Sequence, residues 1–506
     1  MWGANTDELR RFGYEFRAAG VDARAGASLI GNEIAGVTWL GRDAERFRAA
    51  WAETELAIRH LANDIDSLSA EIWRQAAEQD VASESRGAVR GYANYRTSDD
   101  TTNGFLGETL AGSLRGSAGA SNMDAASWSS TVGSVAHALT DHPEPKEGSK
   151  SDQQIADELS QLYANGIAED TAEWFRRNGY DVSTEEGRAS LTELGRKFPD
   201  LVGNLEGAPY VARDAANQAV LNREIVALRA EQNRLGVEFD DDKAKRLQDL
   251  EVLQGVLNES QPGLPRSLIE LHVYDFDHVQ ASVASGELDA ADSVTMFVPG
   301  MNNTISDVVH LVDSAEAIID KAAALQYPPQ TEFASVTFLN FDTPKGVNEE
   351  AWNTPAMYAA EHLRDDLRGL NAVRSDRPVE LNMVAHSYGT NVVHHALSGM
   401  GDRFGVDRVF FVGSSGLPDL PFDAFYDYGS AEQYATEAEK DATAGAGRFW
   451  STHWRDPTGM SHFEYYDSTN GRDGSEGATR HDARGPGGYF EDNSENVRFI
   501  AEAISG

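Results

Sequence analysis

Ser387 is the residue whose surroundings most clearly predict chemistry. It lies in the pentapeptide Ala385-His386-Ser387-Tyr388-Gly389, which follows the predicted strand Glu380–Val384 and precedes a helical pattern that begins near Thr390. A serine on a sharp turn between a strand and a helix exposes its hydroxyl above the sheet, and small residues on either side let the two elements pass closely. The first N–H groups of the helix can then stabilise an oxyanion. We therefore predict that Ser387 is a nucleophile. The structural alternative is a plain strand-to-helix connection.

A second oxyanion donor is expected from an earlier loop. The apolar run Ser293–Val298 ends in Pro299-Gly300-Met301-Asn302-Asn303, and in hydrolases with such a serine turn this loop supplies a backbone N–H group. Gly300 would let the backbone approach the substrate. Met301 and Asn302 are the candidate donors here, and Tyr388 is the candidate next to the nucleophile. A Pro-Gly turn without a role is the alternative.

A serine nucleophile also needs a carboxylate that orients the base. Asp441 is the candidate because it lies just past the β-rich run Gln433–Thr436 and follows the serine in the chain. Three other carboxylates in this part of the sequence, Asp419, Asp423 and Asp427, compete with it, and a solvated acidic loop is the alternative without function.

The base should be a histidine that follows the acid. His453, His462 and His481 are available. His481 is the last of them and lies on a glycine-rich loop before the terminal helical pattern Ser494–Ile504, so it is the predicted base. His462 lies beside the aromatic run Phe463–Tyr466 and is expected to pack there.

These residues need a sheet to position them. After Pro265, short β-rich runs alternate with helical stretches such as Tyr358–Val373 and Thr390–Leu397, which predicts a mostly parallel sheet covered by helices on both faces. Ligands of such sheets bind at the carboxyl ends of the strands, where the candidate residues fall. The expected strands are Leu268–Val273, Ser293–Val298, Ala334–Phe341, Val379–Val384, Arg408–Val412 and Gln433–Thr436.

The second half of the chain resembles a poorly characterised actinobacterial family of α/β-hydrolases. The resemblance is carried by Phe297-Val298-Pro299-Gly300, His386-Ser387-Tyr388-Gly389 and Val412-Gly413-Ser414-Ser415-Gly416, and upstream by Gly203–Pro209 and Arg213–Asn217. It implies the α/β-hydrolase fold and the triad Ser387, Asp441 and His481. The sequence departs from the family at Ala385, where glycine is usual, and at Ser415, where proline is usual.

The first hundred residues predict a helical hairpin. Apolar side chains from Phe47 to Ile72 recur at alternating steps of four and three, which is a heptad pattern, and Trp39 and Gly41 lie at the chain reversal before it. With Tyr95-Arg96-Thr97-Ser98-Asp99, this order resembles the helical-hairpin proteins exported by type VII secretion. The resemblance implies that Trp39, Gly41, Tyr95 and Asp99 bind a secretion partner. An ordinary packing or self-association hairpin is the alternative.

Composition sets the domain boundaries that we expect. Residues 1–100 form the hairpin, 101–150 a Gly/Ser/Ala-rich linker, 151–260 a helical lead-in and 261–506 the hydrolase domain. In the lead-in, 217–235 and 243–257 are expected to pair antiparallel, and Asp240–Asp242 to cap the second helix rather than bind a cation.

Bulk properties exclude several functions. The net charge of −39 disfavours nucleic acid and anionic membranes as partners, and the absence of cysteine excludes disulfides and thiolate chemistry. No apolar run approaches the ~18 residues that span a bilayer. The start Met1–Asn5 lacks signal-peptide character, so a type VII-like route to the medium or envelope, or else the cytoplasm, is the expected destination.

The sequence as a whole favours a serine hydrolase of esterase or lipase type that acts on a small-molecule or lipid ester and needs no metal or organic cofactor. A peptidase or amidase would use the same residues. The alternative of another class is a secreted interaction protein that works through its hairpin, with a hydrolase domain that is inactive or secondary.

Overall fold

The computed structural model describes residues 150–506 except 262, 275–277, 327–330, 342, 344–353, 419–425 and 451–452, together with isolated positions between 23 and 75. By its contacts the chain divides into two units, Met1–Gln79 with Ala156–Gly506, and Asp80–Ile155. Apart from the start of one helix, the elements below belong to the first unit. No helix among the described residues is both long and apolar enough to cross a bilayer.

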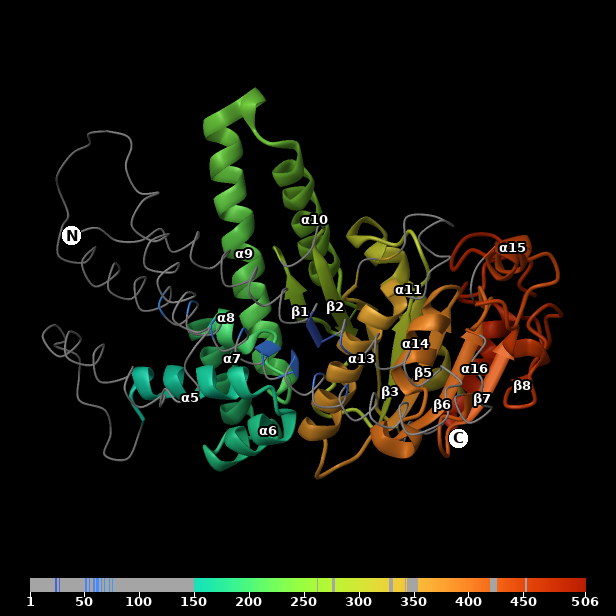
Figure 1. Ribbon diagram of the computed structural model, residues 1–506, viewed down its shortest axis with the longest axis horizontal. Coiled ribbons are helices and arrows are strands. Elements are labelled where there is room, and N and C mark those ends of the chain that lie inside the picture. Colours follow the sequence, from blue (N-terminus) through green and yellow to red (C-terminus); the bar gives the residue numbers. More distant parts are fainter. Residues whose placement is uncertain are drawn as a thin grey trace, which may run out of the picture. The chain divides into compact units, whose positions relative to one another are not determined.

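Helices precede the sheet in the chain and then alternate with its strands (Figure 1). The strands are β1 (Arg266–His272), β2 (Gln280–Ser285), β3 (Ser293–Val298), β4 (Phe333–Leu339), β5 (Glu380–His386), β6 (Val406–Val412), β7 (Glu432–Thr436) and β8 (Glu464–Tyr465). The α-helices are α5 (Asp152–Asn165), α6 (Ala168–Arg177), α7 (Glu185–Lys197), α8 (Pro199–Val202), α9 (Tyr210–Leu235), α10 (Asp241–Asn258), α11 (Val308–Leu325), α13 (Thr354–Val373), α14 (Gly389–Leu397), α15 (Ala442–Trp450) and α16 (Glu495–Ser505). Short 3₁₀ turns are η3 (Gly236–Glu238), η4 (Ile305–Asp307), η5 (Gly401–Phe404) and η7 (Pro457–Gly459).

The strands form one sheet in the order β1-β2-β4-β3-β5-β6-β7-β8. β3 to β8 pair in parallel, whereas β1 pairs antiparallel with β2, and β2 pairs antiparallel with β4. The predicted sheet is therefore confirmed as mostly parallel. The carboxyl ends of β5, β6 and β7 lie next to one another, because these strands are neighbours that run in the same direction.

Alternate residues of the strands enter two separate cores. On one face, Phe297, Val384 and Phe410 pack with α11 and α16. On the other, Met296, Met383 and Phe411 pack with α13 and α14. Helices thus cover both faces, as predicted, and this burial explains why the strands read as nearly continuous apolar runs in the sequence.

Two strands escaped the sequence prediction. β2 has the sequence Gln-Ala-Ser-Val-Ala-Ser, whose small side chains have low β propensity, and it is held by pairing on both sides with β1 and β4. β8 is only two residues long and pairs with Tyr434 and Ala435 of β7. Both segments are strands because neighbouring strands pair with them, and the local sequence does not indicate this pairing.

The predicted antiparallel pair in the lead-in is present as α9 and α10 (Figure 1). Lys243 pairs with Glu231 near the turn, and Gln254 bonds to Asn222 farther from it, an order that only antiparallel helices give. The side chain of Asp240 accepts hydrogen bonds from the N–H groups of Asp242 and Lys243, so the acidic run caps α10 as expected.

The lead-in helices pack directly against the sheet and its helices. Leu221, Leu250 and Leu253 belong to the same buried core as β1 and α11. Side chains of the lead-in also bond to the outer edge of β1: Asp214 accepts from the N–H of Leu268, and Asn217 donates to the Leu268 carbonyl. An exposed strand edge invites pairing with another chain, and these polar side chains close it.

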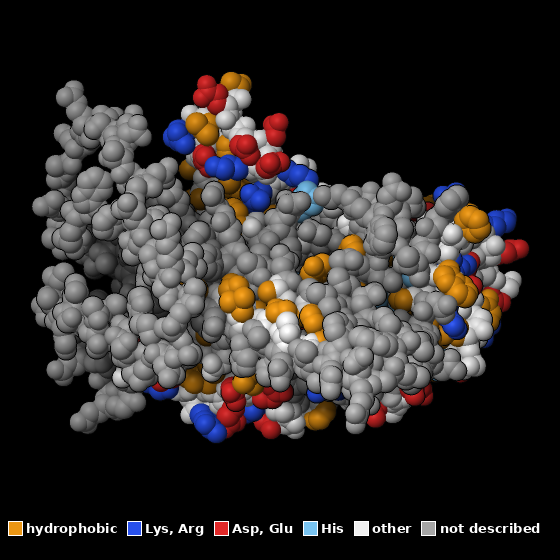
Figure 2. Space-filling view, viewed as in Figure 1, with side chains coloured by type: hydrophobic (Ala, Val, Ile, Leu, Met, Phe, Trp, Pro, Cys, Tyr) orange, Lys and Arg blue, Asp and Glu red, His pale blue; other side chains and the backbone are white. Residues whose placement is uncertain are grey.

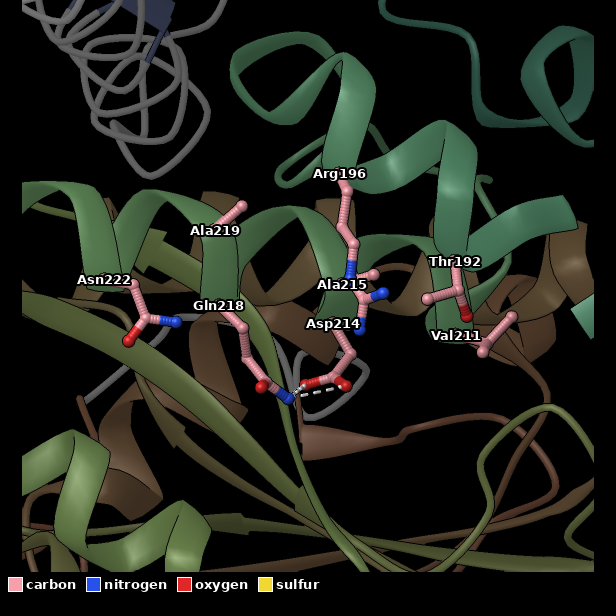
Figure 3. A pocket seen from close by; sticks show the side chains of 8 residues that line it. All are labelled: Thr192, Arg196, Val211, Asp214, Ala215, Gln218, Ala219 and Asn222. Atoms are coloured by element: carbon pink, nitrogen blue, oxygen red, sulfur yellow. Dashed lines mark hydrogen bonds between the residues drawn. The ribbon is translucent and has the colours of Figure 1, made fainter. Parts of the chain in front are cut away.

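Beside this contact, α7 and α9 line an open pocket of about 240 Å³ (Figure 3). The lining residues are Thr192, Arg196, Val211, Asp214, Ala215, Gln218, Ala219 and Asn222. Gln218 donates to Asp214 there. Because Asp214 already accepts the N–H of Leu268, we interpret this pocket as part of the contact between the lead-in helices and the edge of β1.

The predicted export residues Trp39, Gly41, Tyr95 and Asp99 lie outside the described residues, as does 101–149. Described positions between Trp51 and Gln75 are helical, and two leucines of the heptad pattern, Leu61 and Leu68, are 56% and 49% exposed. The hairpin remains a prediction.

Candidate active site

Ser387 lies at the end of β5, on the turn that begins α14. Its φ of 55° is in the left-handed region, which is unfavourable for a residue with a side chain, and its N–H donates to the Val412 carbonyl of β6. The Oγ1 of Thr390 donates to the Ser387 carbonyl at 2.7 Å. The surrounding contacts therefore hold the serine in a strained conformation, as the sequence pattern predicted.

Two glycines allow the chain to pass close to this turn. A Cβ atom at Gly389 would lie 2.3 Å from the Val298 carbonyl oxygen, and one at Gly300 would lie 2.7 Å from the Cβ of Ser387. The β3 loop therefore touches the turn at Ser387 directly, which only residues without side chains permit.

The structure brings Ser387, His481 and Asp441 together. Nε2 of His481 is 2.7 Å from Oγ of Ser387, and Nδ1 of His481 is 2.8 Å from both carboxylate oxygens of Asp441. An ionised carboxylate only accepts hydrogen bonds, so Nδ1 carries the proton. Nε2 is then the acceptor and can take the serine proton.

Asp441 lies just after β7 and is buried. Its carboxylate also accepts from the N–H of Ala444 at 2.9 Å and from the hydroxyl of Tyr489 at 2.9 Å. Burial alone would raise the pKa of Asp441, but the bonds from His481, Ala444 and Tyr489 outweigh it and lower that pKa below its ordinary value. The group is thus a fixed anion beside the imidazole.

Sequence reasoning missed Tyr489 and Gly413. Tyr489 accepts the N–H of Ala438 and donates to Asp441, so it fixes the Asp441 carboxylate from the far end of the loop that carries His481. Gly413 has φ 56°, and a Cβ there would lie 3.0 Å from the Asp441 carboxylate. The sequence shows a glycine after β6 and a tyrosine after His481, but neither residue type reveals which group it contacts.

The competing residues lie elsewhere. His453 is fully buried with its Nδ1 3.1 Å from the Ser415 carbonyl, and the ring of His462 lies 6.1 Å from that of Tyr426. Asp427 is exposed and accepts from the N–H of Gly429. Asp419 and Asp423 lie outside the described residues. Among the described candidates, only His481 and Asp441 contact the serine or each other.

The loop proposed to supply the second oxyanion donor is ordered by its own side chains. Nδ2 of Asn303 donates to the Gly300 carbonyl at 2.8 Å, and Asn302 adopts a left-handed φ of 62°. The phenol oxygen of Tyr388 accepts the N–H of Ala356 at 3.0 Å. The donor roles of Met301, Asn302 and Tyr388 remain predictions.

Three carboxylates away from this site, two buried and one partly exposed, could hold a cation. Oxygens of Glu206, Glu270 and Asp366 lie within 4.8 Å of one another. However, the guanidinium of Arg213 pairs with both oxygens of Glu206 and lies 3.4 Å from Glu270. A cation already occupies the cluster, so we assign no metal to it.

Comparison with known proteins supports the fold. Residues 275–448 match the family described as Alpha/beta hydrolase. Two uncharacterized proteins of Mycobacterium tuberculosis, MT2140 of strain CDC 1551 / Oshkosh and Rv2079 of strain ATCC 25618 / H37Rv, are each 25% identical to this chain over 239 residues. The chain spans 36% of the length of these relatives, and 43% of the chain is aligned. With the sheet order, the family match establishes the α/β-hydrolase fold.

Proposed function

We propose that the protein is a serine hydrolase that cleaves carboxylic esters, including lipid esters, with Ser387 as nucleophile, His481 as base and Asp441 as orienting acid. One observation carries the proposal: the unbroken hydrogen-bond chain from the Ser387 hydroxyl through both nitrogens of His481 to Asp441. The match of residues 275–448 to the Alpha/beta hydrolase family supports a hydrolase in general.

In the proposed reaction, Oγ of Ser387 attacks the ester carbonyl while Nε2 of His481 takes its proton. His481 then donates that proton to the leaving alcohol, and an acyl-enzyme remains on Ser387. Water, deprotonated by the same nitrogen, releases the acid. Asp441 keeps the proton on Nδ1 and stabilises the imidazolium, while the backbone at Tyr388 and Met301 is proposed to hold the oxyanion.

Labelling with a fluorophosphonate probe tests the nucleophile. The intact protein should be labelled once, at a peptide that contains Ser387, and Ser387→Ala should be unlabelled while it keeps its thermal unfolding midpoint. His481→Ala should lose labelling, whereas His462→Ala should retain it. Labelling of Ser387→Ala at an equal rate would refute the assignment.

Ester and amide cleavage are distinguished by substrates that share an acyl group. We expect p-nitrophenyl butyrate to be hydrolysed and the matching p-nitroanilide to be cleaved far more slowly. A comparison of p-nitrophenyl esters from two to sixteen carbons would then define the acyl chain that the site accepts. Faster cleavage of the anilide would favour the amidase alternative.

A further inference from the structure

The base His481 lies on a loop that has little regular structure of its own. Residues 466–494, between β8 and α16, contain no helix or strand. Within the loop, the backbone bonds to itself, for example from the N–H of Tyr489 to the Asp482 carbonyl and from the N–H of Phe490 to the Ala483 carbonyl. These internal bonds shape the loop, Tyr489 bonds it to Ala438 and Asp441, and Phe490 packs on Phe297 of β3. A further contact joins the loop to the strand that carries Ser387.

A histidine that the triad does not use makes that connection. His386 immediately precedes Ser387 at the end of β5, and its Nε2 lies 2.8 Å from the backbone carbonyl oxygen of His481. A carbonyl oxygen only accepts hydrogen bonds, so Nε2 of His386 must carry a proton and donate it. The nucleophile strand is thereby bonded directly to the backbone of the base.

Ring packing holds His386 in place for this bond. Its ring centroid lies 5.0 Å from the ring of His481, and the rings of Tyr489 and Phe490 each lie 5.7 Å away in edge contacts. His386 is only 6% exposed. A buried donor and a buried acceptor that lose each other leave both groups unsatisfied, so the contact is costly to break.

The charge state of the His386 ring suits a group that must donate a hydrogen bond at every working pH. Burial, and then the neighbouring His481, lower the pKa of His386 to about 3. The ring thus stays neutral over the pH range in which an ordinary histidine titrates, and it adds no positive charge beside the imidazolium that forms on His481 during the reaction.

We infer that His386 is a positioning residue that sets the distance between the base and the nucleophile by holding the backbone carbonyl of His481. The inference rests on the proposed function, because it assigns a role within the same site. His386 touches no reacting atom in this role. Its contribution is to keep Nε2 of His481 within hydrogen-bond reach of Oγ of Ser387, and a displacement of about 1 Å at such a contact can cost roughly 100-fold in rate.

Three substitutions separate the hydrogen bond from the packing. His386→Phe keeps the ring but removes the donor. His386→Gln places an amide N–H near the position of Nε2 and should restore the bond, whereas His386→Asn is one methylene shorter and should not reach. His462→Phe is the matched control, since that histidine lies away from the triad, beside Tyr426.

The first readout is the rate of the reaction. For His386→Phe we expect kcat for p-nitrophenyl butyrate and the rate constant of fluorophosphonate labelling to fall roughly 10- to 100-fold. KM should change less than twofold, and the labelled fraction should still reach the wild-type value. His386→Gln should recover most of the rate. If His386→Phe does not fold, the Gln and Asn pair makes the same comparison.

The second readout does not depend on hydrolase activity. Amide hydrogen exchange followed by mass spectrometry should show faster exchange in the peptide covering 478–490 for His386→Phe and His386→Asn, and unchanged exchange for His386→Gln and His462→Phe. If the wild-type protein hydrolyses no ester, the proposed function is refuted, but the comparison of hydrogen exchange between the variants remains valid. Rates and exchange in His386→Phe equal to those of the wild type, or a Gln variant as impaired as the Phe and Asn variants, would overturn the inference.

Discussion

Replacing Asp441 with asparagine preserves the volume of the side chain and changes its hydrogen-bond character. The N–H of Ala444 donates to one carboxylate oxygen, so the amide oxygen of the new asparagine belongs at that position. Its NH₂ group then occupies the other oxygen's place, 2.8 Å from Nδ1 of His481 and 2.9 Å from the hydroxyl of Tyr489.

Two losses follow from that placement. The bond from Nδ1 loses its charge assistance, which is worth about 1.5–3 kcal/mol for a charged partner, and the negative charge that stabilises the imidazolium is lost. In addition, one of the two oxygen positions 2.8 Å from Nδ1 becomes an NH₂ group, which opposes an N–H on Nδ1, while the neutral amide oxygen at the other position still accepts it. The preference for the reactive tautomer is therefore weakened, and the other tautomer, with its proton on Nε2, cannot accept the proton of Ser387. We expect Asp441→Asn to lower kcat by roughly 10⁴-fold, as in other serine triads. That factor corresponds to about 5 kcal/mol of transition-state stabilisation.

Steady-state hydrolysis of p-nitrophenyl butyrate, with fluorophosphonate labelling as a second measure, tests this expectation. Thermal unfolding establishes that the variant folds. Asp427→Asn is the control, because Asp427 is an exposed carboxylate of the same region that bonds only locally to Gly429 among the described residues. It should retain full activity. An Asp441→Asn variant within tenfold of wild type, alongside an inactive Ser387→Ala, would show that Asp441 does not set the tautomer.

Gly413→Ala should slow fluorophosphonate labelling at least tenfold, because the new Cβ requires a left-handed φ and would lie 3.0 Å from the Asp441 carboxylate; a fully active variant would contradict this. Asn217→Ala should lower the free energy of unfolding in urea by about 2 kcal/mol, since the buried Leu268 carbonyl loses the Asn217 donor and the Gly203 carbonyl keeps only the longer bond from Arg213, and a change below about 0.5 kcal/mol would refute it. Burial raises the pKa of Glu206 to about 7 from 4.5, so the folded protein holds this proton more tightly than the unfolded chain does. The free energy of unfolding should therefore fall by about 3 kcal/mol as the pH rises from below 4.5 to above 7. Urea unfolding at pH 5 and 8 should show a smaller pH dependence in Glu206→Gln, and an equal dependence would assign the titration elsewhere. Deleting 1–100, the proposed export hairpin, should keep the protein inside a host with a type VII system; equal secretion of the deleted form would make the hairpin structural.

The sequence alone determined the features that depend on local chain geometry. A strained serine needs small neighbours and a strand followed by a helix, and these requirements are visible around Ser387 without any knowledge of distant residues. The alternation of apolar runs and helical patterns likewise predicted the central parallel strands, because burial on both faces makes each of them apolar. The capping role of Asp240 could be read for the same reason, since a cap acts within one turn of its own helix.

Tertiary structure decided everything that depends on which segments meet. Chain order favoured His481 over His453 and His462, but the contact itself, from Nε2 of His481 to Oγ of Ser387, depends on the path of the loop after β8. β2 is a strand because β1 and β4 pair with it, although its own residues favour no strand. The bond from His386 to the backbone of His481 spans 95 residues of sequence. Such contacts are set by the packing of whole elements against each other, and periodicity and spacing within one segment carry no information about them.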